Sequence, residues 1–277
     1  MPRPLVMGVV NVTPDSFSDG GRYVEPRAAV AHGLALVEAG ADVLDVGGES
    51  TRPGATRPLV AEELARVVPV ITELAAAGAT VSVDTMRAEV AQAALEAGAA
   101  IVNDVSGGLA DPAMLPTVAG SDATYVAMHW RAHADRMAAL ADYPDGVVPT
   151  VRHELAGRVE AAVAAGVPLE RLVLDPGLGF AKRPAHNWEL LRGLDEMASL
   201  GARLLVGASR KSFLGTLLAD AAGEPRPVDA REAAHLAVVL HCARAGVWAV
   251  RVHDVGSACD ALAAWSALEE PTSVTGG

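Results

Sequence analysis

The stretch TVSVDTMRAEVAQAALEAGAAIVND, residues 80–104, contains one complete structural unit of the chain. It begins with a short apolar run at 80–83, continues with a helical pattern to Gly98, and ends in a second apolar run at 100–102. Gly98 suits the position just past a helix, where the backbone takes a left-handed turn that glycine adopts without strain. The order strand, helix, glycine, strand is typical of a parallel sheet, in which a helix connects successive strands.

The same order repeats along the whole chain, with Gly40, Gly78 and Gly166 in positions equivalent to Gly98. The apolar, often β-branched runs are at 5–10, 42–46, 80–83, 100–102, 123–128, 171–174, 203–206 and 247–252. Eight units in 277 residues predict an α/β protein with a single (β/α)8 or TIM barrel, which commonly takes ~250 residues. An open, doubly wound sheet is the second choice.

The domain organisation expected from the sequence is simple. No linker or change of composition divides the chain, so we expect one domain over residues 1–268 and a disordered tail over 269–277. A long loop is expected at 130–146, after the fifth strand. The helix that follows this loop is expected to bury the face formed by Val148, Val151, Leu155, Val159 and Val163, which step by three and four.

Composition excludes several classes of protein. Hydrophobic residues make up 51% of the chain and charged residues 20%, which indicates a folded chain with a large core. The net charge of −12 argues against a general nucleic-acid or membrane-surface binder. Cys242 and Cys259 lack metal or redox spacing and are expected to be reduced packing residues. The apolar run after the N-terminus is too short for a signal peptide, so a cytoplasmic protein is expected.

Nearly every predicted strand ends on polar side chains. They are Asn11, Asp45 with Glu49, Asp84, Asn103 with Asp104, His129, Asp175, Ser209 to Lys211, and Arg251 with His253. A single Asp or Asn after a strand often only caps a turn. Eight polar ends on one rim indicate an active site, because barrels of this type carry their sites at the C-terminal ends of the strands.

The charges at these ends indicate the ligand. The positive groups of the last two units are Lys211, Arg251 and His253, and these units often hold a phosphate in such barrels. Asp84, Asn103 and Asp175 suit a flat polar ring with N–H groups, because a carboxylate forms strong charge-assisted hydrogen bonds. We therefore expect an enzyme that binds a phosphorylated, nitrogen-rich small molecule.

Three further segments have unusual compositions. The loops at 11–21 and 47–54 combine polar side chains with glycine and proline and are expected to act as lids. The run at 175–182 lacks the third glycine of a dinucleotide-binding motif. It ends at Lys182, which with Lys211 makes up all the lysine of the chain.

Seven motifs resemble the dihydropteroate synthase family over nearly the whole chain. They are MGVVNVTPDSFSDGG (7–21), DVGGESTRPG (45–54), VSVDT (81–85), NDVSG (103–107), DPGLGFAK (175–182), GASRKSF (207–213) and RVHD (251–254). One departure follows His129, where many relatives have Met-Gln-Gly and this chain has Trp130-Arg131-Ala132. The role of the 130–146 loop and that of Lys182 stay open on this resemblance.

The resemblance implies a homodimeric barrel of folate biosynthesis. Such an enzyme joins 6-hydroxymethyl-7,8-dihydropterin pyrophosphate to p-aminobenzoate and releases pyrophosphate, assisted by Mg²⁺. The residues implied for pterin pyrophosphate are Thr51, Asp84, Asn103, Asp175, Lys211, Arg251 and His253. Those implied for p-aminobenzoate are Thr51, Arg52, Pro53, Phe180 and Ser212. Asn11 is implied for the metal, and Asp19, Arg52 and Lys211 for catalysis.

We hypothesise a dissociative substitution at the pterin methylene carbon, with Asp19 helping to shelter the cationic intermediate. Two alternatives remain open. A pterin-binding methyltransferase would share the barrel but would not need the loops at 11–21 and 47–54 or the segment at 209–212. A non-catalytic paralogue would be expected to have lost residues of the loops or of the anion site, and here those residues are present.

Overall fold

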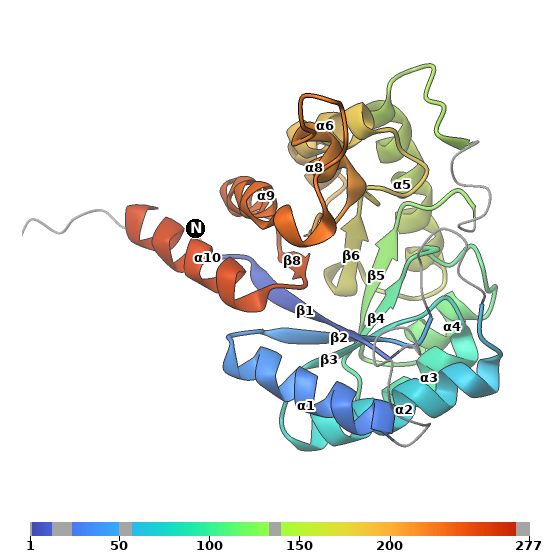
Figure 1. The fold of residues 1–277 in the computed structure, drawn as a ribbon. Coiled ribbons are helices and arrows are strands. Elements are labelled where there is room, and N and C mark those ends of the chain that lie inside the picture. Colours follow the sequence, from blue (N-terminus) through green and yellow to red (C-terminus); the bar gives the residue numbers. More distant parts are fainter. Residues whose placement is uncertain (1, 13–23, 50–56, 133–139, 270–277) are drawn as a thin grey trace, which may run out of the picture.

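The computed structural model describes residues 2–12, 24–49, 57–132 and 140–269. Within these ranges eight parallel strands form a closed barrel, and helices surround it (Figure 1). The strands are β1 (Leu5–Asn11), β2 (Val43–Gly47), β3 (Val81–Asp84), β4 (Ile101–Asp104), β5 (Thr124–Met128), β6 (Leu172–Asp175), β7 (Arg203–Val206) and β8 (Ala249–Val252). The predicted barrel is confirmed, and the open sheet is excluded because β1 pairs with both β2 and β8.

The helices follow the strands in the expected alternation. They are α1 (Val24–Glu38), α2 (Val60–Ala76), α3 (Ala88–Glu96), α4 (Met114–Ala119), α5 (Val147–Ala164), α6 (Pro184–Arg192), α7 (Leu194–Ala198), α8 (Ser212–Leu217), α9 (Glu232–Arg244) and α10 (Val255–Glu269). None of these described helices is both long and apolar enough to cross a membrane. Helix α10 continues to Glu269, one residue past the predicted domain boundary, and the rest of the predicted tail lies outside the described residues.

Apolar side chains pack on both sides of the barrel wall. Between the wall and the helices, Leu44 and Val46 of β2 share one core with Val67, Ile71 and Leu74 of α2. The inside of the barrel is filled by a second, smaller cluster. Its buried members are Met7, Val43, Ile101, Val126, Val173, Leu205 and Ala249. This inner layer closes the barrel below the strand ends, so the interior is a packed core and not a pore.

Glycines end the helices where the sequence predicts them. Gly40, Gly78, Gly98 and Gly166 all have positive φ angles, of +102°, +87°, +107° and +100°. Cys242 and Cys259 are free thiols in α9 and α10, as expected.

Candidate active site

A polar layer lies directly above the apolar filling of the barrel. Side chains of a strand alternate between its two faces, so every second residue points into the barrel. Asp45 therefore follows Val43 on the inner face, and Arg251 follows Ala249. The same spacing of two places Asn103 above Ile101 and Asp175 above Val173. The change from apolar to polar on the inner face thus occurs at one level, at the C-terminal ends of the strands.

Arg251 lies between two carboxylates in this layer. Its Nε is 2.6 Å from Asp45 Oδ2, and its Nη2 is 2.9 Å from Asp84 Oδ2. Asn103 donates from Nδ2 to the same Asp45 oxygen over 3.1 Å. The sequence predicts separate cationic and acidic parts of the rim, whereas in the structure Arg251 joins the acidic residues in one cluster.

Asp45 is the fully buried member of this cluster, and its hydrogen bonding is incomplete. Asp45 is 0% exposed, and its Oδ1 has no hydrogen-bond partner among the described residues. Burial raises the pKa of Asp84 to about 7, although the charge of Arg251 opposes this shift. A ligand with N–H groups would supply the donors that such carboxylates lack, because a buried polar atom without a partner is costly.

Asp175 and Lys211 form the opposite part of the layer. The Gly177 amide donates to Asp175 Oδ1 over 2.7 Å, and burial raises the pKa of this carboxyl. Burial lowers the pKa of Lys211 to about 8, while Asp175 acts in the opposite direction. The Lys211 ammonium donates to the Leu178 carbonyl oxygen and lies 5.0 Å from the centre of the Phe180 ring. Lys211 therefore connects the rim to the loop that carries Phe180.

Both lysines follow a strained residue. Ala181 (φ +48°) and Arg210 (φ +63°) are the non-glycine residues with positive φ in the described part of the chain. Each directly precedes one of the two lysines. Such conformations cost about 1–3 kcal/mol each and persist where the surrounding structure enforces them. Here they bring both ammonium groups onto the segment 178–180, since Lys182 donates to the Phe180 carbonyl and Lys211 to the Leu178 carbonyl.

The remaining residues predicted for the site lie either at the rim or outside the described residues. His253 Nδ1 is 3.0 Å from Ser209 Oγ, Ser212 is exposed at the start of α8, and Asn11 ends β1. Asp19, Thr51, Arg52 and Pro53, with most of both predicted lids, lie outside the described residues.

Comparisons with known proteins all point to one protein family. A model of the family described as pterin binding enzyme matches residues 7–253. The dihydropteroate synthase of Mycobacterium leprae (strain TN) is 57% identical over 258 residues, which cover 93% of this chain and 90% of that protein. The chain belongs to the dihydropteroate synthase family. It is therefore a transferase.

Solved structures of dihydropteroate synthases share the fold. The enzyme of Xanthomonas albilineans with 4-aminobenzoic acid is 46% identical, with a TM-score of 0.88, and the match covers 97% of this chain and 94% of that one. The same enzyme in complex with 7,8-dihydropteroate matches at 44% identity and a TM-score of 0.85, over 97% and 95% of the two chains.

The sequence places Asp45 and His129 among the polar strand ends and Lys182 at the end of its motif, but it assigns them no contacts. In the structure Asp45 contacts Arg251, and His129 contacts Lys182. Asn187 of α6 is a residue beside the dihydropteroate synthase site that the sequence does not predict, and it accepts a 2.6 Å hydrogen bond from the Gly179 amide. These contacts depend on side-chain lengths and loop conformations, which spacing along the chain does not reveal.

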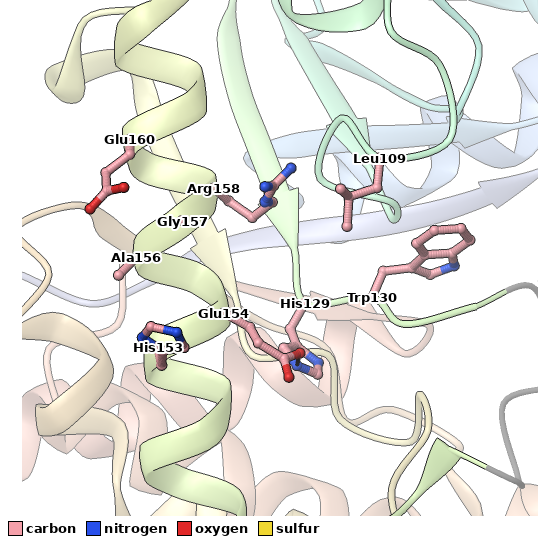
Figure 2. A pocket seen from close by; sticks show the side chains of 9 residues that line it. All are labelled: Leu109, His129, Trp130, His153, Glu154, Ala156, Gly157, Arg158 and Glu160. Atoms are coloured by element: carbon pink, nitrogen blue, oxygen red, sulfur yellow. Dashed lines mark hydrogen bonds and ion pairs between the residues drawn. The ribbon is translucent and has the colours of Figure 1, made fainter.

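A cavity of about 500 Å³ lies beside this layer, against α5. It is lined by Leu109, His129, Trp130, His153, Glu154, Ala156, Gly157, Arg158 and Glu160. Figure 2 shows the Glu154 carboxylate turned toward the His129 ring at its wall. None of the residues predicted to bind the substrates of a dihydropteroate synthase lines it.

Proposed function

We propose that this chain condenses 6-hydroxymethyl-7,8-dihydropterin pyrophosphate with p-aminobenzoate to give 7,8-dihydropteroate and pyrophosphate in folate biosynthesis. The observation that carries the proposal is the buried cluster of Asp45, Asp84 and Arg251 in the barrel mouth. It supplies acceptors for the N–H edge of a pterin and a guanidinium for an anion in one place. Membership of the dihydropteroate synthase family supports the same reaction.

Pterin binding is assigned to Asp84, Asn103 and Asp175, with Lys211 reaching the ring. Desolvated carboxylates bind an amidine-like edge strongly, because each N–H to oxygen bond is charge-assisted. Burial separates Asp84 from water and raises its pKa. The N–H donors of a pterin would replace the lost hydrogen bonds and favour the ionised carboxylate. Thr51 is assigned beside the pyrophosphate end of the same substrate.

Pyrophosphate binding is assigned to Arg251 and His253. Arg251 uses Nε and Nη2 for its two carboxylates, and its Nη1 has no hydrogen-bond partner among the described residues. The carboxylates hold the planar guanidinium in a fixed orientation, which leaves Nη1 as the donor for a phosphate oxygen. A preorganised donor of this kind stabilises the charge that develops on the leaving group.

The reaction breaks the bond between the pterin methylene carbon and the pyrophosphate oxygen. The p-aminobenzoate nitrogen then forms a bond to that carbon and loses a proton. Phe180 and Ser212, with Thr51, Arg52 and Pro53, are assigned to p-aminobenzoate, and Asp19 is assigned to shelter the cationic methylene. Arg52 and Lys211 are also assigned catalytic roles, and Arg52 lies outside the described residues.

Mg²⁺ is part of this proposal, with Asn11 as its protein ligand. Magnesium prefers oxygen ligands, and commonly binds through one or two protein oxygens, water and substrate phosphates. The amide oxygen of Asn11 at the end of β1 fits that donor set. The described residues contain no group of three His, Cys, Asp or Glu side chains that could hold a metal. When bound, the ion would neutralise charge on the departing pyrophosphate.

We also propose that the chain forms a homodimer and acts in the cytoplasm, as the sequence leads us to expect. Neither property is needed for the chemistry described above.

The test is a pyrophosphate-release assay with and without p-aminobenzoate. A dihydropteroate synthase releases pyrophosphate only when both substrates are present, and 7,8-dihydropteroate accumulates in equal amount. A pterin-binding methyltransferase or a non-catalytic paralogue would bind the pterin and release no pyrophosphate in response to p-aminobenzoate. That outcome would reject the proposal, and isothermal calorimetry with the pterin alone would show that the protein was folded.

A further inference from the structure

Lys182 is a buried charge that the assignments above leave without a role. Its ammonium nitrogen lies 3.0 Å from His129 Nδ1 and donates to the Phe180 carbonyl oxygen over 3.0 Å. Burial lowers the pKa of Lys182 to about 7, and Asp175 counteracts part of this shift. Removing an ammonium from water is costly, and the two hydrogen bonds of Lys182 offset part of that cost.

The contacts of Lys182 continue into a chain of hydrogen bonds. An ammonium group only donates, so His129 Nδ1 accepts and the ring proton is on Nε2. His129 Nε2 then donates to Glu154 Oε2 of α5 over 2.7 Å, the pair drawn in Figure 2. Burial, with the charge of Lys182, lowers the pKa of His129 to about 4, which keeps the ring neutral and suits this arrangement. The chain ends at Arg131, whose Nη2 is 2.6 Å from Glu154 Oε1.

A second connection joins the same two loops. The Arg131 guanidinium lies 4.2 Å from the centre of the Tyr143 ring. The Tyr143 hydroxyl donates to the Ala181 carbonyl oxygen over 3.0 Å. Residues 180 and 181 are therefore each held through their carbonyl oxygen by a group linked to the loop after β5.

We propose that Lys182 and Tyr143 are positioning residues that fix Phe180 for p-aminobenzoate, with His129, Arg131 and Tyr143 of the segment after β5 acting as a brace for the loop after β6. This inference rests on the proposed function, because it assigns the Phe180 ring to that substrate. The Phe180 ring also lies 5.0 Å from the Lys211 ammonium. Moving the Phe180 backbone would thus shift one wall of the p-aminobenzoate subsite, whereas Asp84 and Asn103 of the pterin subsite lie on other strands.

The first test is steady-state kinetics of Lys182→Met, which keeps the length of the side chain and removes its donors. We expect the KM for p-aminobenzoate to rise about 10-fold, the effect of losing one charged hydrogen bond. The KM for pterin pyrophosphate should rise less than the KM for p-aminobenzoate, since Lys182 acts on the pterin subsite only through the charge of Asp175. Tyr143→Phe should also raise the KM for p-aminobenzoate, but by a smaller factor. If Lys182→Met does not fold, Tyr143→Phe tests the positioning role. Arg152→Met is the control, since Arg152 is on α5 like Glu154 but bonds Ser199 at the surface.

A double-mutant cycle separates positioning from general stability. If Lys182 acts through Phe180, then Lys182→Met should change the KM for p-aminobenzoate by less than about twofold in a Phe180→Ala background. Effects that multiply in the double variant would overturn the inference. So would an unchanged KM for p-aminobenzoate in both single variants, or equal rises for both substrates. A wild-type enzyme without p-aminobenzoate-dependent pyrophosphate release would instead overturn the proposed function.

Discussion

At the scale of single residues, the site is organised around one half-buried guanidinium. Arg251 is paired with Asp45 and Asp84, so neither carboxylate is an isolated buried charge. Removing one charged side chain of this group leaves the remaining charges unpaired. The free energy of unfolding then falls by more than the ion pair itself contributes. Substitutions that keep shape and change charge are therefore the informative ones.

Asp84→Asn is the substitution that tests pterin recognition. It keeps the size of the side chain but replaces a carboxylate acceptor, so charge-assisted hydrogen bonds to the pterin are lost. We expect calorimetry to show pterin affinity reduced about 10- to 100-fold, with the far-UV circular dichroism unchanged. Asp122→Asn, at an exposed aspartate, is the matched control. Near-normal affinity in Asp84→Asn would contradict the assigned role.

The pKa of Asp84 predicts a pH dependence with a definite sign. Burial raises this pKa from 3.8 to about 7, against the effect of Arg251. Asp84 thus favours folding below pH 3.8, and this contribution is lost as the pH rises through about 7. Pterin binding has the opposite dependence because it needs the ionised form.

Calorimetric titrations between pH 8 and pH 5.5 should therefore show weakening affinity for the pterin below about pH 7, by up to ~10-fold per pH unit for one proton. Asp84→Asn should flatten most of this slope. A residual slope is expected from Asp175, whose pKa burial also raises. Equal slopes in the wild type and the variant would show that another group controls binding.

At the scale of elements, local signals predict the strands and helix ends well. Each of the eight predicted runs contains a strand, because short apolar runs between helices bury both faces in a parallel barrel. The predicted face of α5 is partly wrong. Val151 and Leu155 are buried, but Val163 is 49% exposed and Ala162 is buried instead. At about 100° per residue, position 162 lies close to the direction of 155, whereas 163 has turned away.

The loop after β6 is predicted to depend on Gly177. Its φ is +68°, and an added Cβ would lie 2.5 Å from the His129 carbonyl oxygen. Gly223 has a φ of +85° with nothing within 4 Å of an added Cβ. Gly223→Ala should lower the free energy of unfolding by about 1 kcal/mol for its φ alone. Gly177→Ala should lower the free energy of unfolding by at least ~2 kcal/mol more than Gly223→Ala does, because the backbone must move to make room for the added Cβ. Chemical denaturation measures both, and equal losses would show that the loop relaxes without strain.

At the scale of the whole molecule, the sequence predicts which residues share the rim but not how they touch. A parallel barrel brings all its strand ends together, so eight polar ends predict one site. The contact of Arg251 with Asp45 joins residues 206 positions apart and depends on side-chain lengths across the barrel. The brace between the loops after β5 and β6 depends equally on loop conformations that no periodic pattern encodes.

Assembly is the last property at this scale, and it follows from the proposed homodimer. An apolar hollow of about 630 Å³ lies between α6, α8 and α9, lined by residues that include Trp188, Leu217 and Val238. Leu217 is 60% exposed there. If a second copy of the chain covers this hollow in a two-fold symmetric dimer, one substitution places two altered residues in the interface. Leu217→Asp should therefore give a monomer by light scattering, because an unpaired buried carboxylate costs several kcal/mol. Leu268→Asp, at an 84% exposed leucine of α10, should stay dimeric. A dimer that survives Leu217→Asp would place the interface on another face.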